Sequence, residues 1–232
     1  MVCGLFGTTK REVPLNKEFF YPLIYTKYNG EIYISGSNQY YNFVLNNIKD
    51  IDFTKLNNKH IIAFFKKLFS DVLENFEVKE MYRMYRDTKL NITGNDAVLL
   101  NKNNKKYFMN TGKKSNDVSF KEKKWKELKN IIDTEMIYII KTENKITSMA
   151  YVSDIFAEGA NIVVSTDEKN RRKGYGKKVV AQLTNSIIER KLLPIYFVNI
   201  NNKPSINLTK SLEYINIADE IVVCVKKEKM FI

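Results

Sequence analysis

The chain has 232 residues, of which 44% are hydrophobic and 28% charged, enough for one large domain or two small ones. No apolar run approaches the roughly 20 residues of a membrane-spanning helix, and the first residues lack the basic-then-apolar order of a signal peptide. Two cysteines, Cys3 and Cys224, and one histidine exclude a disulfide framework and a structural zinc site, so we expect a cytoplasmic protein without a metal.

The net charge of +12 has two interpretations. It is compatible with nucleic-acid binding, which uses lysine and arginine against phosphates. The lysines are scattered from end to end rather than gathered in one segment, however, and attraction of a polyanionic cofactor is the simpler use of the charge. Nucleic-acid binding therefore stays as an alternative only.

The first half of the chain predicts a small α+β arrangement. Two strands between Phe19 and Ser35 are joined at Asn29-Gly30, a strong signal for a tight turn. Apolar residues at helical spacing predict helices over Tyr40–Ile48 and His60–Phe76, with Asp52 or Thr54 capping a short helical turn between them. We further expect a strand or irregular edge over Met81–Arg86, a second hairpin formed by Ala97–Asn101 and Lys106–Met109, and a domain boundary in the polar stretch Thr111–Asp117.

The second half alternates strands and helices. The expected elements are a helix over Ser119–Ile132, strands over Met136–Lys141, Ile146–Ser153, Asn161–Ser165 and Ile195–Ile200, a helix over Lys203–Leu212, and closing strands over Tyr214–Ile217 and Ile221–Lys226. The fold class that follows is α/β (α+β), a mixed twisted sheet flanked by helices. With a boundary at residues 115 and 116, the domains would be 1–115 and 116–232.

The segment between the strand at Ile162–Val164 and the helix after Gly176 has the pattern expected of a phosphate-binding site. The loop carries Arg171, Arg172 and Lys173, and glycines stand at 174 and 176. Unpaired backbone N–H groups in a first helical turn, the positive end of the helix dipole and nearby cations all attract anions. The glycine spacing excludes a nucleotide-triphosphate P-loop, and Val179 replaces the third glycine of a dinucleotide-binding turn.

Arg171-Arg172-Lys173-Gly174-Tyr175-Gly176 resembles the Arg/Gln-x-x-Gly-x-Gly/Ala signature of the GNAT superfamily of acyl-CoA-dependent N-acetyltransferases. Asn202-Lys203-Pro204-Ser205 is similar to that family's Asn-x-x-Ala/Ser step, and Ser211-Leu212-Glu213-Tyr214 takes the place of its Leu-Gly-Phe. The resemblance covers the C-terminal half and implies a GNAT-like fold there. The first half looks like the extra N-terminal part of two-part GNAT proteins and would lie on the acceptor side.

The resemblance implies that acetyl-CoA, or another acyl-CoA, is the ligand. Its diphosphate would lie on the backbone amides of the glycine loop, and its pantetheine arm would pair with the strand before it like an added strand. Asn202 and Ser205 would lie near the thioester. The implied cofactor-binding residues are Val163, Val164, Ser165, Thr166, Arg171, Arg172, Lys173, Gly174, Tyr175, Gly176, Lys177, Asn202 and Ser205.

The reaction implied by the resemblance is direct attack of a primary amine, of a small molecule or a peptide, on the thioester. Glu158 is the first candidate for the base and Asp154 the second. Thr209 stands where the family often has a tyrosine acid, and Tyr214 is another candidate for that role. A threonine hydroxyl is a poor acid, so a non-catalytic acyl-CoA-binding module is an alternative; the sequence leaves the acceptor and the oligomeric state open.

Overall fold

The computed structural model describes residues 2–8, 19–94, 96–111 and 117–226. The chain forms two compact units, the first made of residues 1–84, 197–203 and 216–232, the second of residues 85–196 and 204–215. The chain passes between the units at residues 84/85, 196/197, 203/204 and 215/216, and none of these four junctions coincides with the boundary expected at residues 115 and 116. The difference arises because the last strand of the chain pairs with a strand of the first unit, a long-range pairing that the local composition does not report.

The sheet of the first unit has the strand order β1-β3-β2-β10-β4. β2 (Phe19–Tyr28) and β3 (Glu31–Ser37) form the expected hairpin, in which Asn29 and Gly30 have φ angles of 50° and 81°. β1 (Val2–Thr8) is parallel to β3, whereas β10 (Ile215–Lys226) is antiparallel to β2. β4 (Phe76–Tyr85) is the last strand of this order, and the mixture of directions confirms a mixed sheet.

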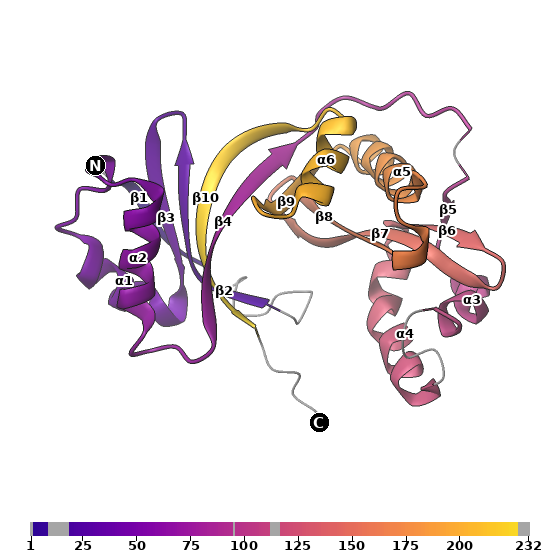
Figure 1. Ribbon diagram of the computed structural model, residues 1–232, viewed down its shortest axis with the longest axis horizontal. Helices are drawn as coiled ribbons and strands as arrows, with labels where there is room; N and C mark the ends of the chain where they lie inside the picture. Colours follow the sequence, from indigo (N-terminus) through magenta and orange to yellow (C-terminus); the bar gives the residue numbers. More distant parts are fainter. Residues whose placement is uncertain (1, 9–18, 95, 112–116, 227–232) are drawn as a thin grey trace. The chain divides into compact units, whose positions relative to one another are not determined.

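Helices α1 (Tyr41–Ile48) and α2 (Asn58–Phe69) cover one face of this sheet (Figure 1). Asn57 caps α2, because its side chain accepts a hydrogen bond from the His60 N–H at 3.0 Å, and Asp52 caps the short turn Phe53–Lys55 as expected. Aromatic side chains fill the space between helices and sheet: Tyr25, Phe53, Phe65 and Phe69 are all buried.

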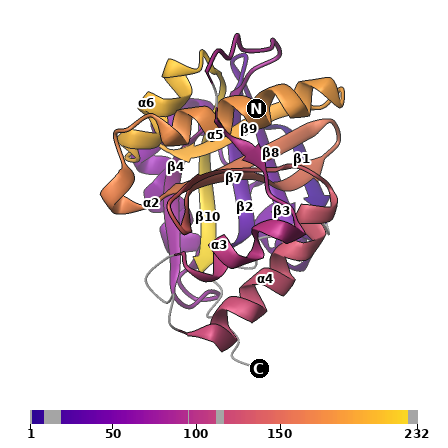
Figure 2. The same ribbon diagram turned by 90° about the vertical axis from the view of Figure 1, so that its right-hand side faces the viewer.

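The second unit contains the strand order β9-β8-β7-β6-β5. β5 is Val98–Leu99, β6 is Ile137–Thr142, β7 is Lys145–Phe156, β8 is Gly159–Thr166 and β9 is Leu193–Asn199. α5 (Tyr175–Glu189) lies on one side of β7 and β8, and α3 (Lys105–Met109) and α4 (Val118–Asp133) lie on the other (Figure 2). The remaining helix is α6 (Lys203–Ser211).

Three expected elements differ from the structure. The helix expected over His60–Phe76 ends at Phe69, and Phe76 is the first residue of β4. The segment Lys106–Met109 is helical rather than a strand, because Asn101 and Asn104 form a capping box that starts a helical turn at Lys102. The closing strands at Tyr214–Ile217 and Ile221–Lys226 are one continuous strand, β10, in which the buried Glu220 is paired with Arg83 and does not break the sheet.

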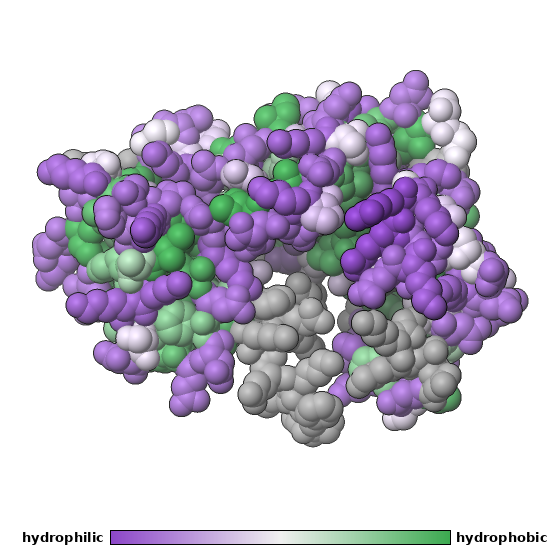
Figure 3. All heavy atoms as spheres, viewed as in Figure 1, coloured by the Kyte–Doolittle hydropathy of each residue, from purple (hydrophilic) through white to green (hydrophobic). Residues whose placement is uncertain are grey.

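Within the described part of the chain, no helix has the length and apolar character needed to cross a membrane. Hydrophilic side chains cover most of the visible surface of each unit, and the apolar side chains between them form small areas (Figure 3).

Candidate functional site

The glycine loop connects β8 to α5 in the second unit. After β8 ends at Thr166, a short 3-10 helix, Glu168–Asn170, leads into the loop, where Arg172 and Gly174 have φ angles of 64° and 78°. The first intrahelical bond runs from the Lys178 N–H to the Gly174 carbonyl at 3.1 Å. Among the described residues, the amides from Arg172 to Lys177 have no acceptor, so this turn presents a row of donors to an anion.

Cations surround these donors. Arg171, Arg172 and Lys173 are exposed and have no carboxylate partner among the described residues. Lys178, by contrast, is paired with Asp96 at 2.8 Å. The loop therefore combines unpaired N–H groups with uncompensated positive charge, the two features that a phosphate requires.

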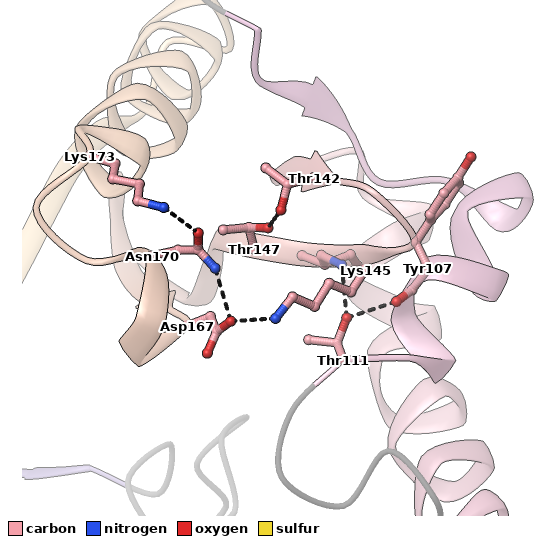
Figure 4. Close-up of polar contacts among 9 residues, drawn as sticks. Tyr107, Thr111, Thr142, Lys145, Thr147, Asp167, Asn170 and Lys173 are labelled. Atoms are coloured by element: carbon pink, nitrogen blue, oxygen red, sulfur yellow. Dashed lines mark hydrogen bonds and ion pairs between the residues drawn. The ribbon is translucent and has the colours of Figure 1, made fainter.

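A polar network joins the loop to the start of β7 (Figure 4). The Asp167 carboxylate accepts hydrogen bonds from Lys145 Nζ at 2.7 Å and from Asn170 Nδ2 at 3.1 Å, and Lys173 Nζ donates to Asn170 Oδ1 at 3.1 Å. The Asp167 N–H also donates to the Thr147 carbonyl. The hydrogen bond from Lys145, and then that from Asn170, hold the pKa of Asp167 below its ordinary value of 3.8.

This network predicts a pH dependence. Because the folded-state pKa of Asp167 is lowered, its contribution to stability is fully present above the ordinary value of 3.8 and is lost as the pH falls through the folded-state pKa. We expect Asp167→Asn to lower the thermal midpoint at pH 7 and to have progressively less effect below about pH 4. Thermal unfolding of both proteins between about pH 3 and 7 checks this; a constant difference across that range would contradict it.

Gly176 brings the first turn of α5 close to the end of β8. A Cβ added at Gly176 would lie 3.2 Å from Thr166 Oγ1, which is itself 2.8 Å from Ser148 Oγ. Glycine at this position therefore allows the helix N-terminus and the strand end to meet, which places the row of amides beside the β8 backbone.

The contact predicts an interaction between positions 176 and 166. Gly176→Ala gains helix propensity but crowds Thr166, so alone it should change the free energy of unfolding little or reduce it. In a Thr166→Ala background it should stabilise by about 1 kcal/mol, whereas in a Thr166→Val background, which keeps an atom at the Oγ1 position, it should not. Urea unfolding followed by fluorescence of the single tryptophan, Trp125, measures the difference; equal effects in both backgrounds would refute the contact.

β8 loses its neighbour on one side before it reaches the loop. Its parallel register with β9 runs from Gly159↔Leu193 to Asn161↔Ile195 and ends there, while its antiparallel register with β7 continues to Thr166. From Ile162 to Thr166 the β8 edge that faced β9 thus has no strand partner within the described residues of this unit. An unpaired strand edge that leads to a row of free amides suits an extended ligand with an anionic end.

Comparisons with known proteins bear on this geometry. A model of the GNAT acetyltransferase family matches residues 8–219. The chain belongs to the GNAT acetyltransferase family. None of the curated proteins compared with the chain matches it.

Two solved structures are similar to this chain at low sequence identity. An acetyltransferase of the GNAT family from Colwellia psychrerythraea is 15% identical, with a TM-score of 0.51 over 70% of this chain and 62% of that one. An N-acetyltransferase-like protein from Streptococcus suis is 17% identical, with a TM-score of 0.49 over 73% of this chain and 69% of that one. The chain thus spans less than two thirds of the Colwellia protein, and the likeness concerns the mixed sheet flanked by helices.

The residues matched to the GNAT glycine signature and to the strand before it gather in the second unit. Val163, Val164 and Thr166 are half-buried along β8, and Ser165 is exposed. Ser205, in α6, is half-buried and forms a hydrogen bond with Tyr196, whose pKa is raised mainly by burial. Asn202 belongs to the first unit, where it is exposed and its N–H donates to the Asn199 carbonyl.

The hydroxyl groups considered as acids lie in the core. Thr209 is fully buried, and its hydroxyl donates to the Ile206 carbonyl at 2.9 Å. Tyr214 is 5% exposed, its hydroxyl is 2.6 Å from Thr184 Oγ1, and burial raises its pKa. Neither hydroxyl presents a free surface to a ligand, so this geometry favours a packing role for both residues.

The carboxylates considered as bases occupy the hairpin between β7 and β8. Glu158 is exposed in the turn, and its backbone carbonyl accepts a hydrogen bond from the Leu193 N–H at 2.7 Å. Asp154 is exposed on β7, directly opposite Asn161. At about 3.3 Å per residue, Glu158 lies about 26 Å along β8 from Thr166, and the position of Asp154 about 17 Å from it.

Sequence reasoning missed two polar residues of the second unit. Asn161 has a buried carboxamide oxygen, Oδ1, without a hydrogen-bond donor among the described residues. Arg86 is 8% exposed, and its guanidinium donates to the Leu212 and Glu213 carbonyls. Neither belongs to a motif, and their roles depend on strands and turns that are distant in the sequence.

Proposed function

We propose that this chain transfers an acetyl group from acetyl-CoA to a primary amine of a small molecule or peptide in the cytoplasm. The observation that carries the proposal is the row of amides from Arg172 to Lys177. Within residues 2–8, 19–94, 96–111 and 117–226 these amides lack acceptors, and they adjoin a strand edge that has no partner strand in the second unit. Membership of the GNAT acetyltransferase family supports the reaction class.

The residues present fit acetyl-CoA. Its diphosphate suits the free N–H groups at the start of α5 together with the exposed cations Arg171, Arg172 and Lys173. The backbone of Val163 to Thr166 offers N–H and C=O groups to the amides of a pantetheine arm, as an edge strand does to an added strand. When bound, the cosubstrate supplies a thioester carbonyl that an amine can attack.

The group that removes a proton from the amine is assigned from the positions of the two candidate carboxylates. A protonated amine must lose a proton before it attacks, and an exposed carboxylate can accept that proton directly or through water. We assign this role to Asp154 ahead of Glu158. Asp154 lies opposite Asn161, which is about 17 Å along β8 from Thr166, and an extended pantetheine arm that starts at the loop has a comparable length. The departing thiolate would take its proton from water, since the Thr209 and Tyr214 hydroxyls are bonded in the core.

The burial of the Thr209 and Tyr214 hydroxyls favours a second candidate function, that of a protein which binds acyl-CoA without turnover. It shares the ligand site and differs only in lacking productive chemistry. A non-catalytic module would bind acetyl-CoA and release no free thiol with any amine offered.

The test has two stages. Calorimetric titration of the full chain with acetyl-CoA should give a dissociation constant in the micromolar range, on the order of 1–100 μM, typical of enzyme substrates. Free thiol is then measured with acetyl-CoA and a panel of diamines, amino acid esters and peptides. Thiol release that depends on the amine supports the transferase; binding without release supports the module; absence of binding refutes both.

A further inference from the structure

A β-bulge lies opposite Asn161 in the hairpin of β7 and β8. The register passes from Val152↔Ile162 to Asp154↔Asn161, so that Ser153 is an extra residue in β7. A bulge places two residues of one strand against one residue of the other, and bulges often re-aim side chains beside functional sites. We call Ser153, Asp154 and Asn161 the bulge site.

Only the nitrogen of the Asn161 carboxamide forms a hydrogen bond among the described residues. Its Nδ2 donates to Ser153 Oγ at 2.8 Å, and Ser153 Oγ is 3.3 Å from the Asn161 carbonyl. Its Oδ1 is buried and lacks a donor among the described residues. Asn185, in α5, shows the usual arrangement, because its Oδ1 accepts from the Leu90 N–H and its Nδ2 donates to the Leu90 carbonyl. A buried acceptor left unpaired is unfavourable, so a ligand that donates to it gains affinity.

Asp154 adds charge to this acceptor. It is the cross-strand partner of Asn161, so the two side chains share a face of the sheet. Asp154 is exposed, and no cation or donor is bonded to it within the described residues. A carboxylate beside an unsatisfied amide oxygen suits a positively charged group with several donors, and a primary ammonium has three.

The bulge site lies where β8 and β9 separate, at the start of the free edge of β8. Asn161 is the last residue of β8 that pairs with β9, about 17 Å along the strand from Thr166 and the glycine loop. A ligand with its anionic end on the loop and its chain along the free edge of β8 would bring its far end toward Asn161.

We propose that the bulge site binds the ammonium group of the acceptor, with the Asn161 Oδ1 and the Asp154 carboxylate as its acceptors. The assignment rests on the proposed transferase function. One proton passes from the ammonium to Asp154, and the amine nitrogen forms a bond to the thioester carbonyl carbon. As the carbon–sulfur bond breaks, the nitrogen loses its second proton, which passes through water to the departing thiolate, so that an amide and a free thiol result. The substrate class is thereby narrowed to amines that are protonated before they bind.

The test uses n-butylammonium as a probe and n-butanol as its neutral counterpart, titrated into the full chain labelled with 15N. We expect the ammonium, and not the alcohol, to shift the side-chain signal of Asn161 and the backbone signals of Ser153 and Asp154, while the side-chain signal of Asn185 stays in place. Asn161→Leu and Asp154→Asn should each weaken ammonium binding at least about tenfold. Equal shifts with the alcohol, or unchanged ammonium binding in both variants, would overturn the assignment.

Acetyl-CoA binding to the same samples separates this proposal from the proposed function. Asn161→Leu should keep the dissociation constant for acetyl-CoA within about twofold of the parent, since it leaves the glycine loop untouched. If the parent binds the ammonium at the bulge site but no acetyl-CoA, the transferase proposal fails and the ammonium site stands. If acetyl-CoA binds and the ammonium does not, the reverse holds.

Discussion

Gly174→Asp is expected to weaken acetyl-CoA binding by about 30- to 150-fold, which corresponds to about 2–3 kcal/mol. Gly174 precedes the first turn of α5, among the amides that have no acceptor in the described part of the chain. A carboxylate there would approach the diphosphate with like charge and would itself accept the free N–H groups. Calorimetric titration with acetyl-CoA measures the effect.

Gly174→Asn is the matched control. Gly174 has a φ of 78°, and Asn and Asp are among the residues that tolerate this left-handed conformation best. A Cβ at this position would have no heavy atom within 4 Å, so both variants fit without a clash. They share shape and backbone strain and differ in charge. If the two dissociation constants agree, the loop does not hold the diphosphate, and the proposed function loses its main support.

Arg86→Leu is expected to destabilise the second unit by about 3–5 kcal/mol. The buried guanidinium donates from Nε to the Thr88 carbonyl at 2.7 Å, and from Nη1 to the Leu212 carbonyl at 3.0 Å and the Glu213 carbonyl at 3.3 Å. Leucine would leave these carbonyls without their donors. Arg86→Lys should rescue little, because a single ammonium cannot reproduce the planar fork. Urea unfolding measures the loss when it is followed by the fluorescence of Trp125, which is half-buried and packs against the core of the same unit.

Glu213 provides the contrast. Its carboxylate is 2.9 Å from Arg86 Nη1, but its side chain is 77% exposed, so Glu213→Gln should change stability by less than about 0.5 kcal/mol. Its φ of 56° explains why the related pattern Leu-Gly-Phe has glycine here, and Glu213→Gly should stabilise by up to about 1 kcal/mol through relief of strain. A large loss in Glu213→Gln would mean that the ion pair, and not the bonds to the carbonyls, makes Arg86 important.

Local signals predicted most of the secondary structure. Asn29-Gly30 predicted the hairpin of β2 and β3 because its left-handed backbone matches the twist of the strands. The apolar period of Val179, Val180, Leu183 and Ile187 predicted α5, and all four are buried. The helix at Lys105–Met109 was wrongly predicted as a strand, because a short apolar stretch has no clear period and the capping by Asn101 decided its conformation.

Some residues of the candidate site could be predicted from local sequence, and others could not. Arg171 to Gly176 stood out because strand, basic loop, glycines and helix are contiguous, so neighbouring residues together specify the proposed anion site. Thr209 and Tyr214 were considered as acids by sequence position, yet their hydroxyls are bonded to Ile206 and to Thr184 in the core. Asn161 was overlooked, since its unpaired oxygen results from a bulge in another strand.

The sequence by itself indicated most of the strands and helices, the basic glycine loop between β8 and α5, and the family, because each of these is specified by residues within about one element of one another. Only the tertiary structure decided that β10 pairs with β2, that β8 and β9 separate after Asn161, and which side chains are buried beside them. These features depend on pairings between residues distant in the chain, where register and the loss of solvent, rather than local propensity, set the free energy.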